Sequence, residues 1–188
     1  MAAPRYSRLA IALHWAIALL ILANLVLGFV AHELLEPATD RAQGQRLNGL
    51  HQSLGLSILL LTLLRMGVRL AAGVPPLPAH MTPTERALAS LTHRGFYVLM
   101  LGIPLAGWAM VSATPAAPPS RWFGLFPWPR LPLPPSEQLA AAAGEAHGLL
   151  AWAAILLVAL HVAGALKHHF LDRDDVLARM LPFRAWRG

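Results

Sequence analysis

The chain has 188 residues, of which 56% are hydrophobic and 13% are charged, and its formal net charge is +6. This composition excludes an ordinary soluble domain and is typical of an integral membrane protein. The basic excess does not indicate nucleic-acid binding, because the basic residues lie at the ends of apolar segments.

Four apolar segments approach or exceed the roughly 20 residues that a helix needs to cross a bilayer. We expect transmembrane helices over about residues 9–31, 49–72, 93–113 and 145–167. Only a helix satisfies its own backbone in lipid, so the predicted fold class is all-α: an integral membrane four-helix bundle forming one domain over residues 1–188. The first segment is too long for a cleaved signal peptide and lacks a small-residue cleavage site.

The basic residues distinguish the two sides of this predicted bundle. One side carries most of them: Arg5, Arg8, Arg65, Arg69, Arg86, Arg94, Lys167, Arg173, Arg179, Arg184 and Arg187. The other side carries Arg41, Arg46, Arg121 and Arg130. By the positive-inside rule, both termini and the tail over residues 168–188 are expected to be cytoplasmic.

The predicted outer connection over residues 114–143 is rich in proline and aromatic residues. Proline excludes regular secondary structure there, and Trp side chains favour the depth of the lipid headgroups. We therefore expect a stiff lid at the interface, which either anchors the chain in the membrane or shapes the path of a substrate. No internal repeat, phosphate-binding glycine loop or nucleophile motif is found.

Five of the nine histidines lie inside or at the ends of the apolar segments: His14, His51, His93, His147 and His161. An imidazole in hydrocarbon needs a partner, either a hydrogen bond to another helix or a metal such as iron. His147 and His161 are separated by about 21 Å along one helix and by about 40° around it. They cannot share one iron, because two axial nitrogens lie on the order of 4 Å apart.

Chain direction supplies a partner for each of these two histidines. His14 and His161 lie at a similar distance from the cytoplasmic side, and His51 and His147 lie at a similar distance from the outer side. Each level therefore holds two imidazoles from different helices, as a bis-histidine haem requires. The sequence predicts two haem b groups, bound non-covalently because a chain without cysteine has no C-x-x-C-H motif. Interhelical hydrogen bonding is the alternative for any single histidine.

Weaker candidates surround these four positions. Gly55, Gly148 and Gly164 follow the histidines closely and could admit either a flat macrocycle or another helix. Arg65 and Arg69 lie near the cytoplasmic end of the second predicted helix, where they either pair with haem propionates or extend to the membrane surface.

His93 has no level partner among the four predicted ligands. It opens the third predicted helix at the cytoplasmic surface, at a depth close to that of His168 and His169. This layer either holds a quinone head group, whose carbonyls accept hydrogen bonds from imidazole, or is a solvated interface.

Motifs along nearly the whole chain match a known membrane family. They are the run from Tyr6 to Leu9, the His14–Trp15 pair, His51-x-Ser53-x-Gly55 followed by Arg65-x-x-x-Arg69, His93 with Tyr97, the frame from His147 through His161 to His168-His169-Phe170, and the Met180-to-Pro182 tail. Together these motifs resemble the prokaryotic cytochrome b561 family.

The resemblance implies a di-haem cytochrome of the bacterial inner membrane that is similar to superoxide oxidases. Superoxide would give up its electron at the outer haem, and the inner haem would reduce ubiquinone. His93 and His168 are then candidates for the quinone side, and Arg121 and Arg130 would steer a small anion such as superoxide. The family's haem ligands fall on the four positions that the depth argument selects: His14, His51, His147 and His161.

The alternative function is a haem b electron-transfer membrane anchor subunit for a dehydrogenase or hydrogenase partner. The short termini and inner loop offer little docking surface, so we expect that no protein partner is required. A histidine-lined metal transporter is disfavoured, because the spans contain almost no acidic residue besides Glu145. The expected partners are membrane lipid, the quinone pool and a small anionic substrate.

Overall fold

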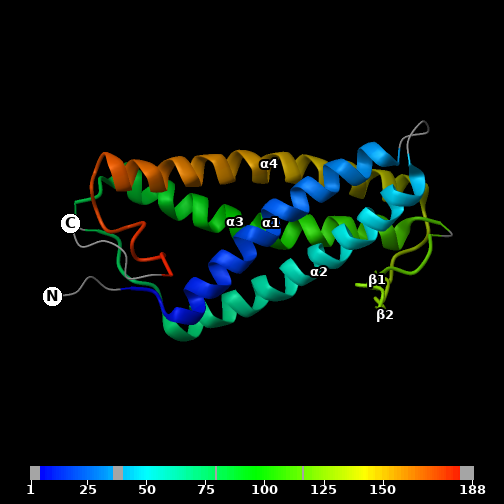
Figure 1. Ribbon diagram of the computed structural model, residues 1–188, viewed down its shortest axis with the longest axis horizontal. Coiled ribbons are helices and arrows are strands. Elements are labelled where there is room, and N and C mark those ends of the chain that lie inside the picture. The colour runs from blue at the N-terminus through cyan, green and yellow to red at the C-terminus, as the bar shows by residue number, and fades with distance from the viewer. Residues whose placement is uncertain (1–4, 36–39, 79, 116, 183–188) are drawn as a thin grey trace.

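The computed structural model describes residues 5–35, 40–78, 80–115 and 117–182. It contains four long helices: α1 (Arg8–Leu34), α2 (Arg41–Ala72), α3 (Pro83–Ala113) and α4 (Glu137–Phe170). Two short strands, β1 (Arg121–Trp122) and β2 (Phe126–Pro127), lie between α3 and α4 (Figure 1). The predicted all-α bundle is confirmed, and all four helices are long and apolar enough to cross a membrane.

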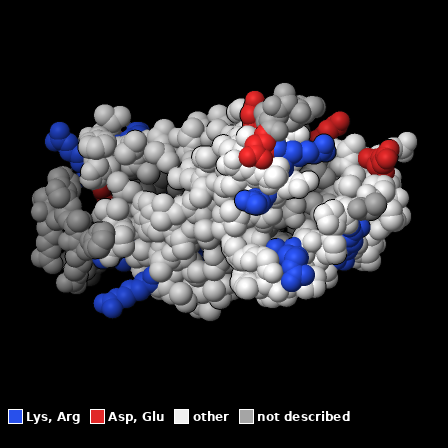
Figure 2. Space-filling model, turned by 45° about the vertical axis from the view of Figure 1, so that its right-hand side comes forward, with Lys and Arg blue, Asp and Glu red and all other residues white. Residues whose placement is uncertain are grey.

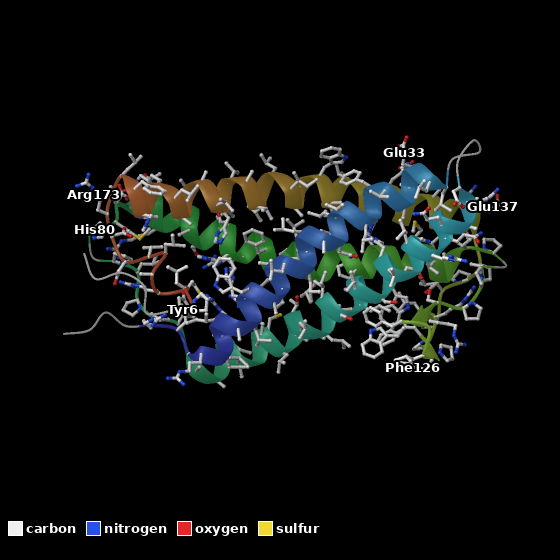
Figure 3. The ribbon with its side chains drawn as sticks, in the orientation of Figure 1. Tyr6, Glu33, His80, Phe126, Glu137 and Arg173 are labelled. Carbon is white, nitrogen blue, oxygen red and sulfur yellow. The ribbon has the colours of Figure 1, made fainter. Side chains whose placement is uncertain are left out.

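The bundle has two distinct ends. The hairpin end carries β1 and β2, and the terminal end carries both ends of the chain (Figure 1). Figure 3 shows Tyr6, His80 and Arg173 at the terminal end and Phe126 and Glu137 at the hairpin end. The helices pack mainly as two pairs, α1 with α2 and α3 with α4, and α2 joins the pairs through α3.

The helices extend beyond the predicted spans because polar caps precede the apolar runs. α2 begins at Arg41, where the Asp40 side chain accepts a hydrogen bond from the backbone N–H of Gln43. α3 begins at Pro83 after a reciprocal capping box between Thr82 and Glu85. The apolar pattern marks the lipid-crossing part of a helix, whereas the cap marks where the helix starts.

The interior of the bundle is small, and its apolar surface is large. Thr62 and Ser53 are almost completely buried, whereas Leu70 is 85% exposed and Leu149 is 73% exposed. Behind the charged side chains of the hairpin end, Figure 2 shows a broad surface without charge. This distribution suits helices whose outer faces contact lipid tails and whose inner faces pack through small and polar residues.

The proline-rich connection contains regular structure that was not predicted. β1 and β2 pair antiparallel, with Arg121 opposite Pro127 and Trp122 opposite Phe126. The turn between them uses positive φ angles at Phe123 (48°) and Gly124 (75°). Proline is tolerated here because the strands are two residues long and each has only one partner.

Side-chain hydrogen bonds fasten this hairpin to α2. The backbone N–H of Phe123 donates to Ser53 Oγ at 2.9 Å, and Trp122 Nε1 donates to Ser57 Oγ at 3.1 Å. Ser120 Oγ donates to Gln52 Oε1 at 2.7 Å. The connection is therefore an ordered lid held against one helix of the bundle.

A second set of hydrogen bonds fastens the connection to α3. Trp108 Nε1 donates to the Pro129 carbonyl at 2.9 Å, and the Leu131 backbone N–H donates to Ser112 Oγ at 3.0 Å. At the opposite end, Trp15 Nε1 donates to the Met180 carbonyl at 2.7 Å, so the tail folds back onto α1.

Candidate functional site

The structure brings together both histidine pairs that the depth argument predicts. The ring centroids of His51 and His147 are 5.8 Å apart, and those of His14 and His161 are 6.2 Å apart. Bonds of about 2 Å from one iron to two opposite imidazole nitrogens would place the ring centroids about 6 Å apart. The spacing of both pairs suits two axial ligands of one metal.

Backbone carbonyls orient both imidazoles of the hairpin pair, His51 and His147. His51 Nδ1 lies 3.0 Å from the Asn24 carbonyl oxygen of α1, and His147 Nδ1 lies 2.9 Å from the Ile103 carbonyl oxygen of α3. A carbonyl only accepts, so each Nδ1 carries the proton. Nε2 of each ring then keeps its lone pair, which is the tautomer that a metal ligand needs.

Two glycines make room for these hydrogen bonds. A Cβ atom on Gly28 would lie 2.9 Å from the His51 ring, and one on Gly107 would lie 3.0 Å from the His147 ring. Each glycine is four residues after the carbonyl that its histidine reaches, so it sits directly beside the path of the imidazole. Any larger residue would push the histidine away from its carbonyl.

The glycines selected from the sequence do not have this role. A Cβ atom on Gly148 or Gly164 would meet nothing within 4 Å, and one on Gly55 would only make an ordinary contact of 3.6 Å with Asn24. Gly55 and Gly148 line the cavity around His51 and His147, so whether they admit a macrocycle stays a prediction. The close contacts with the imidazoles come from glycines of the facing helices, because an imidazole points away from its own backbone toward its neighbour.

A regular spacing in the sequence could have identified Gly28 and Gly107. Gly28 follows His14 by fourteen residues, and Gly107 follows His93 by the same interval. Fourteen residues also separate His147 from His161. α1 and α3 thus share a histidine–glycine spacing, and α1 packs mainly against α2 as α3 packs mainly against α4.

A cavity of about 640 Å³ contains the hairpin pair. Its lining is mostly apolar and includes Gly28, Gly107 and Trp128. Among the described residues, the buried Trp128 Nε1 and Asn24 Oδ1 of this lining have no hydrogen-bond partner. An apolar cavity with two convergent imidazoles and two unused polar atoms fits a haem, whose ring is apolar and whose edge carries carboxylates.

At the terminal end, the structure corrects the predicted position of His93. The ring centroid of His93 lies 5.8 Å from that of His161, so His93 is level with the pair of His14 and His161. The error arose because α3 begins at Pro83, which places His93 about 15 Å inside the helix rather than at its start. His14, His93 and His161 thus form a terminal cluster of three imidazoles.

In the terminal cluster, His14 and His161 pack against aromatic rings. The His161 ring packs against Phe96 at a centroid distance of 5.2 Å, and the His14 ring packs against Trp15 at 5.4 Å. His93 hydrogen-bonds the Ala89 carbonyl one turn back on α3. Ring distances alone therefore leave His14 and His93 as competing partners of His161.

The two predicted propionate partners lie beside the terminal cluster. Arg65 is half-buried, and its Nη1 donates to the Ala10 carbonyl at 2.8 Å, one turn before His14. The Arg69 guanidinium lies 5.8 Å from the centre of the Tyr97 ring. Both arginines line a cavity of about 460 Å³ that also contains Tyr6 and Tyr97. None of the described residues that line this cavity is acidic, so an anionic group would meet positive charge from both arginines there.

His168 does not share a layer with His93. It lies seven residues beyond His161 on α4, about 10 Å further along the axis, and pairs with Asp172 and Asp174. Burial of Asp174 favours the neutral carboxyl, but hydrogen bonds from the Val176 backbone, His168 and His80 outweigh it and lower the pKa of Asp174. The sequence predicted one quinone layer that contains both His93 and His168. In the structure His93 lies beside His161, whereas His168 lies beside Asp172 and Asp174.

The arginines of the hairpin end are partly engaged by backbone carbonyls. Arg121 donates to the carbonyls of Gly124 and Leu125, and Arg130 donates to that of Ala117. Figure 2 shows acidic side chains beside the basic ones at this end. Among the described residues, the acidic ones near this end are Glu33, Asp40, Glu137 and Glu145. The balance of charges weakens long-range attraction of an anion, and only the local field near each guanidinium remains.

Comparison with known proteins adds independent information. A family model described as prokaryotic cytochrome b561 matches residues 5–183. Cytochrome b561 homolog 2 of Escherichia coli K12 is 32% identical over 94% of this chain and 91% of its own length. Cytochrome b562 of Cereibacter sphaeroides is 32% identical over 95% and 96%. A protein of Yersinia pestis named probable superoxide oxidase CybB is 30% identical over 95% and 96%.

Proposed function

Because the chain belongs to the prokaryotic cytochrome b561 family, whose members are membrane electron-transfer proteins with b-type haem, we propose that it carries two haems and transfers single electrons from superoxide to ubiquinone. The observation that carries this proposal is the presence of two imidazole pairs of suitable spacing, 5.8 Å and 6.2 Å, at different levels of one bundle. One haem in each pair would supply a one-electron redox centre.

His51 and His147 are the proposed axial ligands at the hairpin end. Their Nδ1 atoms are held by carbonyls of two different helices, which fixes both rings before any cofactor binds. The cavity around them supports the assignment, because its glycine-lined walls allow a flat group to approach the backbone.

His14 and His161 are the proposed axial ligands at the terminal end, with Arg65 and Arg69 as partners for propionates. His93 lies beside His161, where an electron would leave the bundle, and we assign His93 to the quinone side. Ubiquinone needs two electrons and two protons to become quinol, so two superoxide ions must each lose one electron and leave as dioxygen. Imidazoles and carboxylates near the exit provide proton-carrying groups.

The proposed setting is the bacterial inner membrane with both termini in the cytoplasm. The positive-inside rule supports this orientation, because most arginines lie at the terminal end of the bundle. The hairpin end would then face the periplasm, where a superoxide ion would approach. The relative named probable superoxide oxidase, which matches this chain over 95% of its length, supports the choice of substrate.

The decisive experiment combines cofactor counting with turnover on the isolated chain. Pyridine haemochrome analysis of the detergent-purified protein should give about two haem b per chain, and His147→Ala should give about one. The wild-type chain should then reduce ubiquinone with superoxide as the only electron source. Two haems without this turnover, together with a co-purifying dehydrogenase or hydrogenase, would instead establish the electron-carrying anchor subunit.

A further inference from the structure

Three metal-ligating side chains, His168, Asp172 and Asp174, meet at the terminal end away from the paired imidazoles, and His80 contacts Asp174 beside them. We propose that His80, His168, Asp172 and Asp174 form a binding site for a divalent cation such as Zn²⁺. We call this group the tail site. Its members come from the connection between α2 and α3, from the last turn of α4 and from the segment that follows α4.

Distances within the tail site suit a common metal. His168 Nδ1 lies 2.7 Å from Asp174 Oδ2 and 3.0 Å from Asp172 Oδ2, and His80 Nε2 lies 3.1 Å from Asp174 Oδ2. Tetrahedral ligands at about 2.0–2.1 Å from Zn²⁺ lie roughly 3.3 Å from one another. The ligand atoms of His168, Asp172 and Asp174 all lie within 4.8 Å of one another, and a rotation of the exposed His80 side chain, which already contacts Asp174, would complete the set.

The end of α4 brings the two carboxylates back to His168. The backbone N–H groups of Leu171 and Asp172 both donate to the Lys167 carbonyl, and that of Asp174 donates to the His168 carbonyl. Arg173 adopts a positive φ of 53°, which turns the chain between the two aspartates. The spacing His168-x-x-x-Asp172-x-Asp174 is thus folded into one compact ligand set.

Two side chains of the tail site are more buried than a solvated ion pair, and a backbone hydrogen bond orients one of its carboxylates. The side chain of Asp174 is 6% exposed and that of His168 is 12% exposed, whereas His80 is 58% exposed and can close the site from solvent. The Val176 backbone N–H donates to Asp174 Oδ1 and leaves Oδ2 to face the two imidazoles. An outer hydrogen bond of this kind orients a carboxylate ligand.

The chemistry of the ligands selects the class of ion. Two imidazole nitrogens and two carboxylate oxygens suit zinc or another first-row divalent ion better than Mg²⁺ or Ca²⁺, which prefer oxygen ligands. Two aspartates balance the charge of such an ion. Lys167 Nζ lies 2.8 Å from Asp172 Oδ2 and also pairs with Glu85, so Glu85 can retain the ammonium when the ion takes that oxygen.

The proposed ion would join three parts of the chain at the terminal end. Figure 3 shows that His80, a member of the tail site, and Arg173, which lies between its two aspartates, are both at this end. Such a link would hold the segment after α4 against the connection between α2 and α3. The inference does not depend on the identity of the electron donor.

The test uses the full chain loaded with haem, so that added metal does not occupy the histidine pairs. The protein is stripped with a chelator, and Zn²⁺ and Mg²⁺ are titrated separately by calorimetry, with bound metal counted by elemental analysis. We expect one Zn²⁺ per chain and no comparable binding of Mg²⁺. X-ray absorption at the zinc edge should show nitrogen and oxygen ligands at about 2.0–2.2 Å, and the optical spectrum of the haems should stay unchanged.

Neighbouring aspartates provide a matched pair of variants. Asp174→Asn removes a ligand and should weaken Zn²⁺ binding more than about tenfold. Asp175→Asn makes the same chemical change at the next residue, whose side chain pairs with Arg179, and should leave binding unchanged. The exposed His80→Ala provides a variant that does not threaten folding and should also weaken binding.

Two outcomes would overturn the proposal. If no Zn²⁺ binds to the haem-loaded chain, the tail site is only an ion-pair contact that holds the tail. If Zn²⁺ binds equally to Asp174→Asn and Asp175→Asn, the metal occupies a different place.

Discussion

The hairpin pair and the terminal cluster both place imidazoles inside the bundle, but the groups that surround these imidazoles differ. At the hairpin end, two imidazoles face two glycines, and each ring is held by a backbone carbonyl. At the terminal end, three imidazoles crowd together, and two of them rest on aromatic rings. At the hairpin end, His51 and His147 are each other's only imidazole neighbours within the described bundle. At the terminal end, His161 lies beside both His14 and His93.

The fourteen-residue spacing explains this difference. On both α1 and α3, a histidine lies at the terminal level and a glycine lies at the hairpin level. On α4, a histidine lies at both levels, whereas α2 has His51 at one level and Arg65 at the other. The hairpin level therefore has two imidazoles opposite two glycines, and the terminal level has three imidazoles and one guanidinium.

The largest expected effect concerns the choice at the terminal level. His14→Ala should remove the inner haem and reduce the haem content by about half, while His93→Ala should keep both haems. Optical and EPR spectra of the oxidised proteins would identify the haem that is lost. If His93→Ala loses a haem and His14→Ala does not, the inner ligand pair is His93 with His161.

The glycines at the hairpin level provide the next test. Gly107→Ala would place a Cβ atom 3.0 Å from His147 Nδ1 and should lower the affinity for the outer haem about tenfold, because overpacking of this kind costs about 1–3 kcal/mol. Gly67→Ala is the matched control, since its Cβ atom would meet nothing within 4 Å and Gly67 does not line the cavity. Haem titration of the two apoproteins measures the difference, and equal affinities would contradict the role of Gly107.

A smaller effect is expected from the indole nitrogen that the protein leaves unused. If Trp128 Nε1 donates to a haem carboxylate, Trp128→Phe removes a hydrogen bond of about 1 kcal/mol, equivalent to about 40 mV for one electron. Trp108 packs against Trp128 but already donates to the Pro129 carbonyl, so Trp108→Phe should leave the potential unchanged. Spectroelectrochemical titration separates the outer haem from the inner one, and identical shifts in both variants would assign the effect to packing.

The smallest effect concerns the arginines of the hairpin end. Joint replacement of Arg121 and Arg130 by glutamine should slow superoxide oxidation about two- to threefold at low salt and less at high salt. Stopped-flow or pulse-radiolysis rates at several ionic strengths provide the measurement. A rate that is insensitive to both the variant and salt would show that superoxide reaches the hairpin pair without electrostatic attraction.

The four helices and the two histidine pairs were predictable, because the length, composition and direction of membrane helices can be inferred from the sequence. Length and composition predict four helices, and helix direction pairs His14 with His161 and His51 with His147. The hydrophobic pattern gave no information about the polar starts of α2 and α3, so His93 was placed at a helix end instead of about 15 Å inside. An apolar pattern indicates which part of a helix contacts lipid. A capping box such as that of Thr82 with Glu85 indicates the residue at which the helix begins.

The remaining features depend on contacts between segments that are distant in sequence. Gly28 and Gly107 acquire their role from histidines on other helices, and a single helix shows no sign of it. The hairpin between α3 and α4 is stabilised by Ser53 and Ser57 of α2, which override the tendency of proline to exclude strands. The tail site likewise needs the turn at Arg173 to bring its aspartates to His168.

The position of His147 and His161 on one helix has a consequence for biogenesis. The chain leaves the ribosome with α4 last, so neither imidazole pair is complete until that helix has entered the bilayer. Cofactor loading is then the final step of assembly, and a chain truncated before α4 should insert but lack both haems. Incorporation of haem would thereby report that all four helices have been made and inserted.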